Sequence, residues 1–274
     1  MPELPEVETV IRVIGPQIRG LLVTQVMIHH PDVIAYPSAK EFSTMLIGKK
    51  IAGMARRGKF IRILLEDGGC LTLHLRMTGG LLVAPADLPL EKHTHVVFRL
   101  SDGRELRFSD MRRFGRFWLI RAEEEDPYSG IAKLGLEPFD ENLTAEYLQK
   151  SLGKRKRAIK ECLLDQSMVA GIGNIYSDEI LFRAKLDPAR TACSLTEEEW
   201  QRLAEYIPSV LRFYTEKNAI TAEEYLKTRG RDYRNTPFLQ VYGQKGKPCP
   251  VCGEPLCKKV VGGRSSVYCP RCQR

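Results

Sequence analysis

The chain has 274 residues and a net charge of +8, with 43% hydrophobic and 28% charged residues, as expected for a soluble globular protein. It contains no apolar run of about 18 residues, so we expect no membrane span. The N-terminus is acidic and lacks the apolar region of a signal peptide, which predicts a cytoplasmic protein. The length allows two domains, and the positive charge favours a polyanionic partner such as nucleic acid.

The first six residues support two interpretations. If Met1 is removed, the chain begins with the secondary amine of Pro2. An α-amino group has a pKa of about 7.7–8.0, so this amine is partly neutral at working pH and can attack an electrophilic carbon. Glu3 is adjacent and could give or take a proton. The same stretch also suits an ordinary helix start, because Pro5 and Glu6 fit the first turn of a helix and its dipole.

The residues that follow predict a β-rich domain. We expect a strand at 21–29 and a short helix at 38–47 that begins at the cap Ser38. Further strands are expected at 50–57, 59–66, 70–75, 80–84, 95–100, 105–108 and 117–120, with hairpin turns at 67–69 and 102–103. Many short strands with closely spaced turns indicate a sandwich or a barrel.

The second half of the chain has a helical pattern. A polar, breaker-rich stretch after residue 121 predicts a linker. Helices are expected at 145–152, 158–165, 174–184 and 196–217, the last of which begins with a capping box formed by Thr196 and Glu199. We therefore predict an α+β protein with an N-terminal β-sandwich and flanking helices at 1–121, a linker at 122–138, a helical domain at 139–244 and a ribbon at 245–274.

The cysteines predict a metal site. Two CxxC pairs, Cys249 with Cys252 and Cys269 with Cys272, are separated by sixteen residues. Four thiolates at this spacing can close a tetrahedron around Zn²⁺, and closed Cys₄ sites are structural. One zinc ion would then supply the folding energy that so small a module cannot obtain from a core. A redox CxxC is less consistent, because the two pairs match each other, and Cys257 is left as a free or packed thiol.

A glycine-containing turn at 169–176 separates two of the expected helices. Gly171 and Gly173 permit close approach of the backbone, and the helix that follows offers free N–H groups and a positive dipole end. Alone, the turn could simply join two helices. Because it follows a basic run at 154–160, we favour a phosphate clamp in which Asn174 is the helix cap, a phosphate donor or both.

Together these motifs resemble the bacterial formamidopyrimidine-DNA glycosylases of the Fpg/Nei family. The resemblance covers the whole chain in one register, at 2–8, 56–60, 74–79, 110–115, 165–179, 241–243 and 268–272. It implies a base-excision-repair DNA glycosylase with AP lyase activity, which removes formamidopyrimidine and also 8-oxoguanine from duplex DNA. It also implies a helix–two-turn–helix in the helical domain, damaged double-stranded DNA as the partner, and a monomer.

The resemblance implies catalytic roles for four residues. Pro2 would be the nucleophile that attacks C1′ of the damaged nucleotide and forms a Schiff base, and β,δ-elimination would follow. Glu3 would be the acid/base that helps to open the sugar. Lys59 would contact a phosphate beside the lesion and assist catalysis, and Glu6 would support the arrangement of the active site.

The resemblance also implies a set of DNA contacts. An enzyme that acts on C1′ must extrude the nucleotide, and the vacated stack needs a wedge. Long apolar side chains fill stacking space, and a planar guanidinium can hydrogen-bond to an unpaired cytosine. Taken singly, Met77 could be a core residue, Arg112 a solvated charge and His74 a satisfied buried histidine. The implied DNA-binding residues are His74, Lys154, Asn174 and Arg264, with Met77, Arg112 and Phe114 as the wedge.

The sequence departs from the family pattern at 217–230. The family usually has a Gly-Gly-Ser/Thr run there, before a loop that covers 8-oxoguanine, whereas this chain has Asn218 and Ala219 and adds Glu223 and Glu224. Glycine lets amides approach a ligand closely, whereas acids repel phosphate. We therefore expect a reshaped lid, with formamidopyrimidines, oxidised pyrimidines or abasic sites as better substrates than 8-oxoguanine.

Two other functions remain open. One is a Nei-like glycosylase for oxidised pyrimidines, although the motif details favour the formamidopyrimidine branch. The other is a catalytically silent protein that binds damaged DNA. The intact Pro2, Glu3 and Lys59 argue against the silent binder, because binding alone needs no N-terminal amine.

Overall fold

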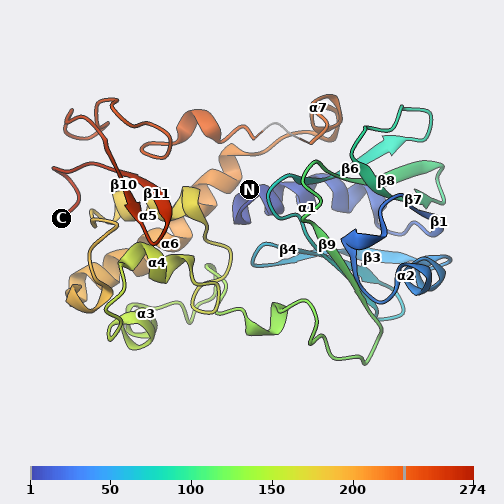
Figure 1. Cartoon of the computed structure of the whole chain (residues 1–274), viewed down its shortest axis with the longest axis horizontal. Helices are drawn as coiled ribbons and strands as arrows, with labels where there is room; N and C mark the ends of the chain where they lie inside the picture. The colour runs from blue at the N-terminus through green and yellow to red at the C-terminus, as the bar shows by residue number, and fades with distance from the viewer. Residues whose placement is uncertain (1, 231–232) are drawn as a thin grey trace. The chain divides into compact units, whose positions relative to one another are not determined.

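The computed structural model describes residues 2–230 and 233–274, which form two compact units (Figure 1). The first unit contains Pro2, residues 6–132 and the described part of 219–233. The second contains residues 3–5, 133–218 and 234–274. Residues 3–5 thus belong to the second unit although they lie near the start of the chain. The described part of 219–233 belongs to the first unit although residues of the second unit precede and follow it.

Two β-sheets form the first unit (Figure 1). One sheet has the strand order β1-β7-β8-β6, from Val23–Ile28, Thr94–Leu100, Arg104–Asp110 and Gly79–Pro85. The other has the order β2-β9-β5-β4-β3, from Ile34–Tyr36, Arg116–Ile120, Cys70–His74, Phe60–Leu65 and Ile51–Arg57. Neighbouring strands are antiparallel except β2 and β9, which are parallel. These sheets confirm the predicted sandwich.

Aromatic side chains join the two sheets in one core. The ring of Phe117 on β9 lies 5.0 Å from that of Phe108 on β8 and 5.9 Å from that of Phe98 on β7, centroid to centroid. Phe42 packs on the same cluster from α2, Ala39–Leu46. Ser38 begins α2 with a complete capping box, as predicted for its cap.

Helix α1 spans Leu4–Ile18, so Pro5 occupies its second position. Val7, Val10 and Ile14 on one face of this helix are buried in the core of the first unit. The apolar spacing that predicted a helix therefore describes its packing as well.

Helix α7, Ala222–Lys227, is absent from the sequence prediction. It begins with a capping box in which Thr221 and Glu224 exchange hydrogen bonds. Tyr225 is buried, and its hydroxyl donates to the carbonyl oxygen of Leu81 on β6 at 3.0 Å. Six residues are too few for a periodic apolar signal, which is why sequence patterning misses this helix. The expected lid lies within residues 217–237, of which Arg231 and Asp232 lie outside the described residues.

The core of the second unit is built from helices (Figure 1). They pack around buried Trp200, Tyr176 and Leu148, and Thr196 and Glu199 form the predicted capping box. The helices are α3 Ala145–Leu152, α4 Ile159–Leu164, α5 Asn174–Arg183 and α6 Glu197–Lys217. Short 3₁₀ turns in the described parts of the two units are η1 Pro31–Val33, η2 Ile131–Lys133, η3 Ala192–Ser194 and η4 Thr236–Phe238.

The ribbon contains a hairpin of β10, Cys257–Val261, and β11, Arg264–Tyr268. Two adjacent buried acids of α5 attach this part of the chain to the helices. Asp178 accepts hydrogen bonds from the hydroxyl of Ser266 and the backbone N–H of Val267, at 2.6 and 2.9 Å. Glu179 accepts from the backbone N–H groups of residues 240–242. These bonds offset the cost of burying both carboxylates.

Within the described ranges 2–230 and 233–274, no helix combines the length and the apolar character that crossing a membrane requires.

Replacing Tyr225 with phenylalanine tests how α7 is held. The variant leaves the buried carbonyl of Leu81 without its donor, which should cost about 1 kcal/mol. We expect amide hydrogen exchange in α7 to become about fivefold faster, as measured by mass spectrometry. Tyr206→Phe is the matched control, because the hydroxyl of Tyr206 has no hydrogen-bond partner among the described residues. Unchanged exchange in α7 would show that the hydroxyl does not hold the helix.

Candidate active site, DNA contacts and zinc centre

Pro2 is buried and lines a cavity of about 250 Å³ in the first unit. One wall comes from the turn after β5 and the start of β6, and another from the end of β8. A third comes from Arg229, Gly230 and Tyr233, which follow α7. Burial, and then the carboxylate of Glu6, raise the pKa of Tyr233, so its phenol stays neutral. The cavity thus holds the expected nucleophile together with a neutral phenol, and Glu6 lies close enough to this phenol to influence its pKa.

Glu3 lies at the N-terminus of α5 in the second unit. Its Oε1 accepts a hydrogen bond from the N–H of Ile175 at 2.9 Å, and its Oε2 accepts one from the N–H of Tyr176 at 3.3 Å. A negative charge is stabilised there by the helix dipole. A Cβ at Gly173 would lie 2.2 Å from Cδ of Glu3, so only glycine leaves room for this carboxylate.

This arrangement corrects the expected role of the glycine turn. Two of the N–H groups assigned to a phosphate bind Glu3 instead. Gly171, with φ of 91°, accepts a hydrogen bond from the N–H of Leu4, so both glycines admit the N-terminal segment. The helix cap is Gly173 and not Asn174. Oδ1 of Asn174 is buried and has no hydrogen-bond partner among the described residues.

The basic run at 154–160 does not form one phosphate-binding patch. Lys160 is fully buried, and its Nζ donates to Asp178 at 2.6 Å and to the carbonyl of Ser265 at 3.0 Å. Arg155 forms an ion pair with Asp165, and Arg157 forms one with Glu161. Lys154 is exposed, as a DNA contact requires. Several basic residues of the run are thus occupied by ion pairs within the folded chain, which the sequence pattern alone does not reveal.

Arg264 lies at the exposed start of β11, beside the glycine turn of the hairpin. The pKa of Lys160 is lowered, mainly by burial. The carboxylates of Asp178 and Glu3 act against this shift, whereas the charge of Arg264 adds to it. Glu3 and Arg264 therefore both lie close enough to the buried ammonium group of Lys160 to influence its pKa. The second unit thus groups a predicted acid/base with a predicted phosphate ligand.

Lys59 and His74 lie near each other, where β4 begins and β5 ends. Lys59 precedes β4, and His74 ends β5, where it pairs with Phe60. Both side chains are buried, and Nδ1 of His74 accepts the N–H of Arg76 at 3.0 Å. Burial, together with the charges of Arg76 and Lys59, lowers the pKa of His74 to about 3. The imidazole is therefore neutral, with its proton on Nε2.

The three expected wedge residues lie together on two loops of the first unit. Nη1 of Arg112 lies 2.9 Å from Sδ of Met77, and Cζ of Arg112 lies 4.6 Å from the ring centroid of Phe114. Met77 and Phe114 are 46% and 45% exposed, which excludes the alternative that Met77 is a core residue. The guanidinium thus contacts both the sulfur of Met77 and the ring of Phe114.

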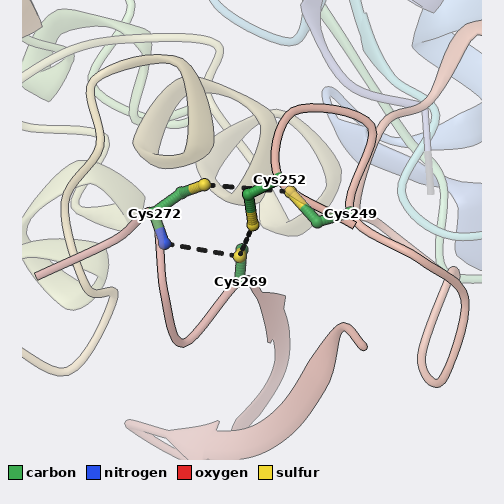
Figure 2. Close-up of side chains that lie close together, drawn as sticks. All are labelled: Cys249, Cys252, Cys269 and Cys272. Atoms are coloured by element: carbon green, nitrogen blue, oxygen red, sulfur yellow. Dashed lines mark hydrogen bonds between the residues drawn. The ribbon is translucent and has the colours of Figure 1, made fainter. Parts of the chain in front are cut away.

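Four cysteines converge in the ribbon (Figure 2). Sγ of Cys249 lies 3.9 Å from that of Cys272, and Sγ of Cys252 lies 3.5 Å from that of Cys269. Sulfurs around a tetrahedral zinc ion lie about 3.8 Å apart, because the Zn–S bond is about 2.3 Å. The four side chains therefore fit a single structural zinc ion, as predicted, whereas Cys257 is exposed and outside the cluster.

The residues that sequence reasoning missed surround the Pro2 cavity. Thr78, Asp110, Arg229 and Tyr233 line its walls. Thr78 and Asp110 stand inside motifs that the resemblance identified. Asp110 is buried at the end of a strand and beside two arginines, a setting in which a carboxylate usually has a specific partner.

Fold and site define a DNA-processing protein with a β-sandwich, a helical domain and a Cys₄ zinc ribbon. Comparison with known proteins identifies its family. Residues 1–117 match the formamidopyrimidine-DNA glycosylase N-terminal domain, residues 134–225 match the H2TH domain of the same glycosylase, and residues 246–274 match the zinc finger found in FPG and IleRS. The chain belongs to the formamidopyrimidine-DNA glycosylase family, which confirms the resemblance seen in the sequence.

Individual relatives are similar over the full length. A formamidopyrimidine-DNA glycosylase of Pelotomaculum thermopropionicum is 46% identical over 274 residues, which cover 100% of this chain and 99% of that protein. Lactococcus lactis Fpg (MutM) in complex with DNA containing an oxidised pyrimidine has a TM-score of 0.91 and 34% identity, with 100% of both chains covered. The Lactococcus lactis complex with FAPY-dG DNA has the same TM-score and identity and covers 99% of this chain and 100% of the other.

Removing the zinc ion should unfold the ribbon. Folding of a small metal module draws on the metal-binding free energy, which is about 10–16 kcal/mol in zinc-finger peptides. We expect one zinc per chain by elemental analysis, and a strong chelator should abolish exchange protection at 246–274 but leave that of the β-sandwich. Cys252→Ala should lose the metal, whereas Cys257→Ser should retain it. Zinc loss from the Cys257 variant would contradict the four-cysteine site.

The neutral state of His74 has a pH signature. Its pKa is about 3 in the folded protein and near 6.5 when unfolded. The unfolded chain thus binds more protons here between these values, so this residue lowers stability as pH falls from 6.5 towards 3. The imidazole resonance of His74 should not shift between pH 5 and 8 in NMR spectra. A midpoint near 6.5, as expected in urea, would show that the folded histidine is solvated.

Proposed function

We propose that this chain is a bifunctional enzyme that removes oxidised purines from damaged duplex DNA and then cuts the strand as an AP lyase. Family membership and the similarity to Fpg–DNA complexes support the glycosylase. One observation carries the catalytic proposal. Pro2 lines a cavity, and the next residue, Glu3, is held by its carboxylate on the first N–H groups of α5.

The nucleophile is the secondary amine of Pro2 after removal of Met1. Its nitrogen lone pair forms a bond to C1′, and the N-glycosidic bond breaks with its electron pair on the leaving base, which gains a proton. Opening of the sugar at O4′ then leaves an iminium between Pro2 and C1′. Glu3 supplies and removes protons in these steps, and its two backbone hydrogen bonds hold the carboxylate in one orientation.

The iminium makes strand cleavage possible. It draws electrons from C2′, so a proton is lost there, and the 3′ phosphate leaves with the electron pair of the C3′–O bond. A second elimination expels the 5′ phosphate, and water then releases the sugar fragment from Pro2. The product is a one-nucleotide gap with a phosphate at both ends.

Several cationic and polar side chains would hold the DNA backbone. Arg264 and Lys154 are exposed charges, and Asn174, the first residue of α5, would donate its NH₂ to a phosphate. His74 would donate from Nε2, because its Nδ1 is occupied. Lys59, next to His74, would place its charge on the phosphate beside the lesion. Such contacts displace counterions, so binding should weaken steeply with salt.

The wedge trio would replace the extruded nucleotide. Met77 and Phe114 offer apolar surface to the neighbouring base pairs, and Arg112 would donate hydrogen bonds to the orphaned base. Their contacts with one another keep the side chains ordered before DNA arrives. Pre-ordering lowers the entropy cost of insertion.

The lid determines which lesions fit. Glu224 binds back to Thr221, and Glu223 pairs with Lys227, so neither acid is an uncompensated charge. Arg229 pairs with Glu91 on the rim of the cavity at 3.2 Å. We propose that this lid accepts formamidopyrimidines better than 8-oxoguanine. A duplex panel that carries formamidopyrimidine, 8-oxoguanine, dihydrouracil or an abasic site measures the ranking, and fastest excision of dihydrouracil would favour a Nei-like enzyme.

The nucleophile is tested by borohydride trapping. Reduction of the iminium should link Pro2 covalently to abasic-site DNA. Pro2→Gly should reduce trapping at least a hundredfold and change DNA affinity by less than threefold, because a primary amine forms a poorer electron sink. Pro16→Ala is the matched control, since Pro16 is an exposed proline within α1. Equal losses of trapping and binding would contradict the assignment, and no adduct from any lesion would favour a silent DNA-binding protein.

A further inference from the structure

Asp110, the last residue of β8, is 1% exposed, and its carboxylate holds the loop that carries Arg112 and Phe114. Oδ1 accepts the N–H of Arg112 at 3.1 Å, and Oδ2 accepts the N–H of Gly115 at 2.7 Å. One buried charge therefore binds the loop on both sides of Phe114. Hydrogen bonds to an ionised acceptor are about twice as strong as neutral ones, so these bonds are suited to fixing a backbone.

Thr78 connects this loop to the other half of the wedge. Its hydroxyl donates to Oδ1 of Asp110 and accepts the N–H of Arg112 at 3.1 Å. Thr78 directly follows Met77 in the chain. The hydroxyl, the carboxylate and the amide thus form a closed ring of hydrogen bonds between two loops 32 residues apart.

The surrounding backbone leaves the loop little freedom. The N–H of Asp110 donates to the carbonyl of His93 at 2.9 Å, and its carbonyl is bound by Nε2 of His95 at 2.7 Å. Arg113 adopts a left-handed conformation with φ of 56°, which costs energy for a residue with a side chain. A Cβ at Gly115 would lie 2.5 Å from the ring of Phe108, so the loop needs glycine at this position.

We propose that Asp110 and Thr78 are positioning residues that make the two wedge loops insert as one unit and thereby determine how strictly the base opposite the lesion is read. The inference rests on the proposed wedge role of Met77, Arg112 and Phe114. A guanidinium with a fixed backbone rejects a wrong base, because its buried donors are then left unpaired. If the loops are uncoupled, Arg112 can shift towards other bases, and discrimination falls.

The experiment uses the full-length chain and duplexes with an abasic site opposite each of the four bases. An abasic site carries no damaged base, so any effect of Thr78, which lines the Pro2 cavity, on such a base is excluded. The measured quantities are kcat and KM for strand cleavage. The fluorescence of 2-aminopurine beside the orphaned base reports insertion, because it depends on stacking and not on chemistry.

Thr78→Val removes the hydroxyl at an exposed position and preserves shape. We expect its preference for the best opposite base over the worst to fall about tenfold, mainly through KM, with a reduced 2-aminopurine signal. Thr78→Ser keeps the hydroxyl and should restore both. Thr44→Val, which removes another exposed threonine hydroxyl in the same unit, should behave as the wild type. Asp110→Asn should lower discrimination in the same direction.

Two outcomes overturn the proposal: wild-type discrimination in Thr78→Val, or an equal defect in Thr78→Ser. Loss of cleavage in the wild-type chain with a normal 2-aminopurine response would refute the lyase instead. The fluorescence comparison of the variants would then still decide the coupling of the loops.

Discussion

The hydrogen bonds from the first turn of α5 to the carboxylate of Glu3 are the contact on which the proposed N-terminal chemistry depends. They hold a buried charge at the positive end of a helix, and they require that Gly173 carry no side chain. Gly171 likewise contacts the N-terminal segment, because its carbonyl oxygen accepts a hydrogen bond from the N–H of Leu4. The proposed nucleophile is the residue just before Glu3, so this short helix start bears directly on where the reactive amine can lie.

The same helix organises the rest of the second unit. Asp178 and Glu179 are buried at its middle, and Asp178 satisfies donors of the ribbon hairpin, whereas Glu179 satisfies donors just before the ribbon. Lys160 completes the network by neutralising Asp178. A buried carboxylate without such partners would be costly, so the hairpin with Arg264 has a defined position relative to α5. The zinc ion serves the same purpose within the ribbon, where little apolar surface is buried.

The proposed wedge in the first unit differs from the buried acids of α5, because its side chains are exposed. Met77, Arg112 and Phe114 are exposed, and exposed side chains ordinarily sample many rotamers. Here a buried carboxylate orders the backbone beneath them, and their mutual contacts order the side chains above it. The proposed chemistry at C1′ and the proposed replacement of the extruded base would thus rely on one principle, in which a buried acid organises a segment that is proposed to meet DNA.

Much of this protein could be predicted from local patterns. The capping box of α6, the cap of α2, the alternating strands and the paired CxxC motifs depend on residues close in sequence, so they were recognisable without a fold. Family resemblance likewise singled out Pro2, Glu3 and the wedge. Only the tertiary structure revealed that Lys160 is a buried ion-pair partner, that the glycines at 171 and 173 admit the N-terminus, that α7 docks through Tyr225, and that Asp110 joins two loops. The physical reason is that burial and hydrogen-bond satisfaction depend on residues distant in the chain, whereas propensity, capping and ligand spacing are local properties.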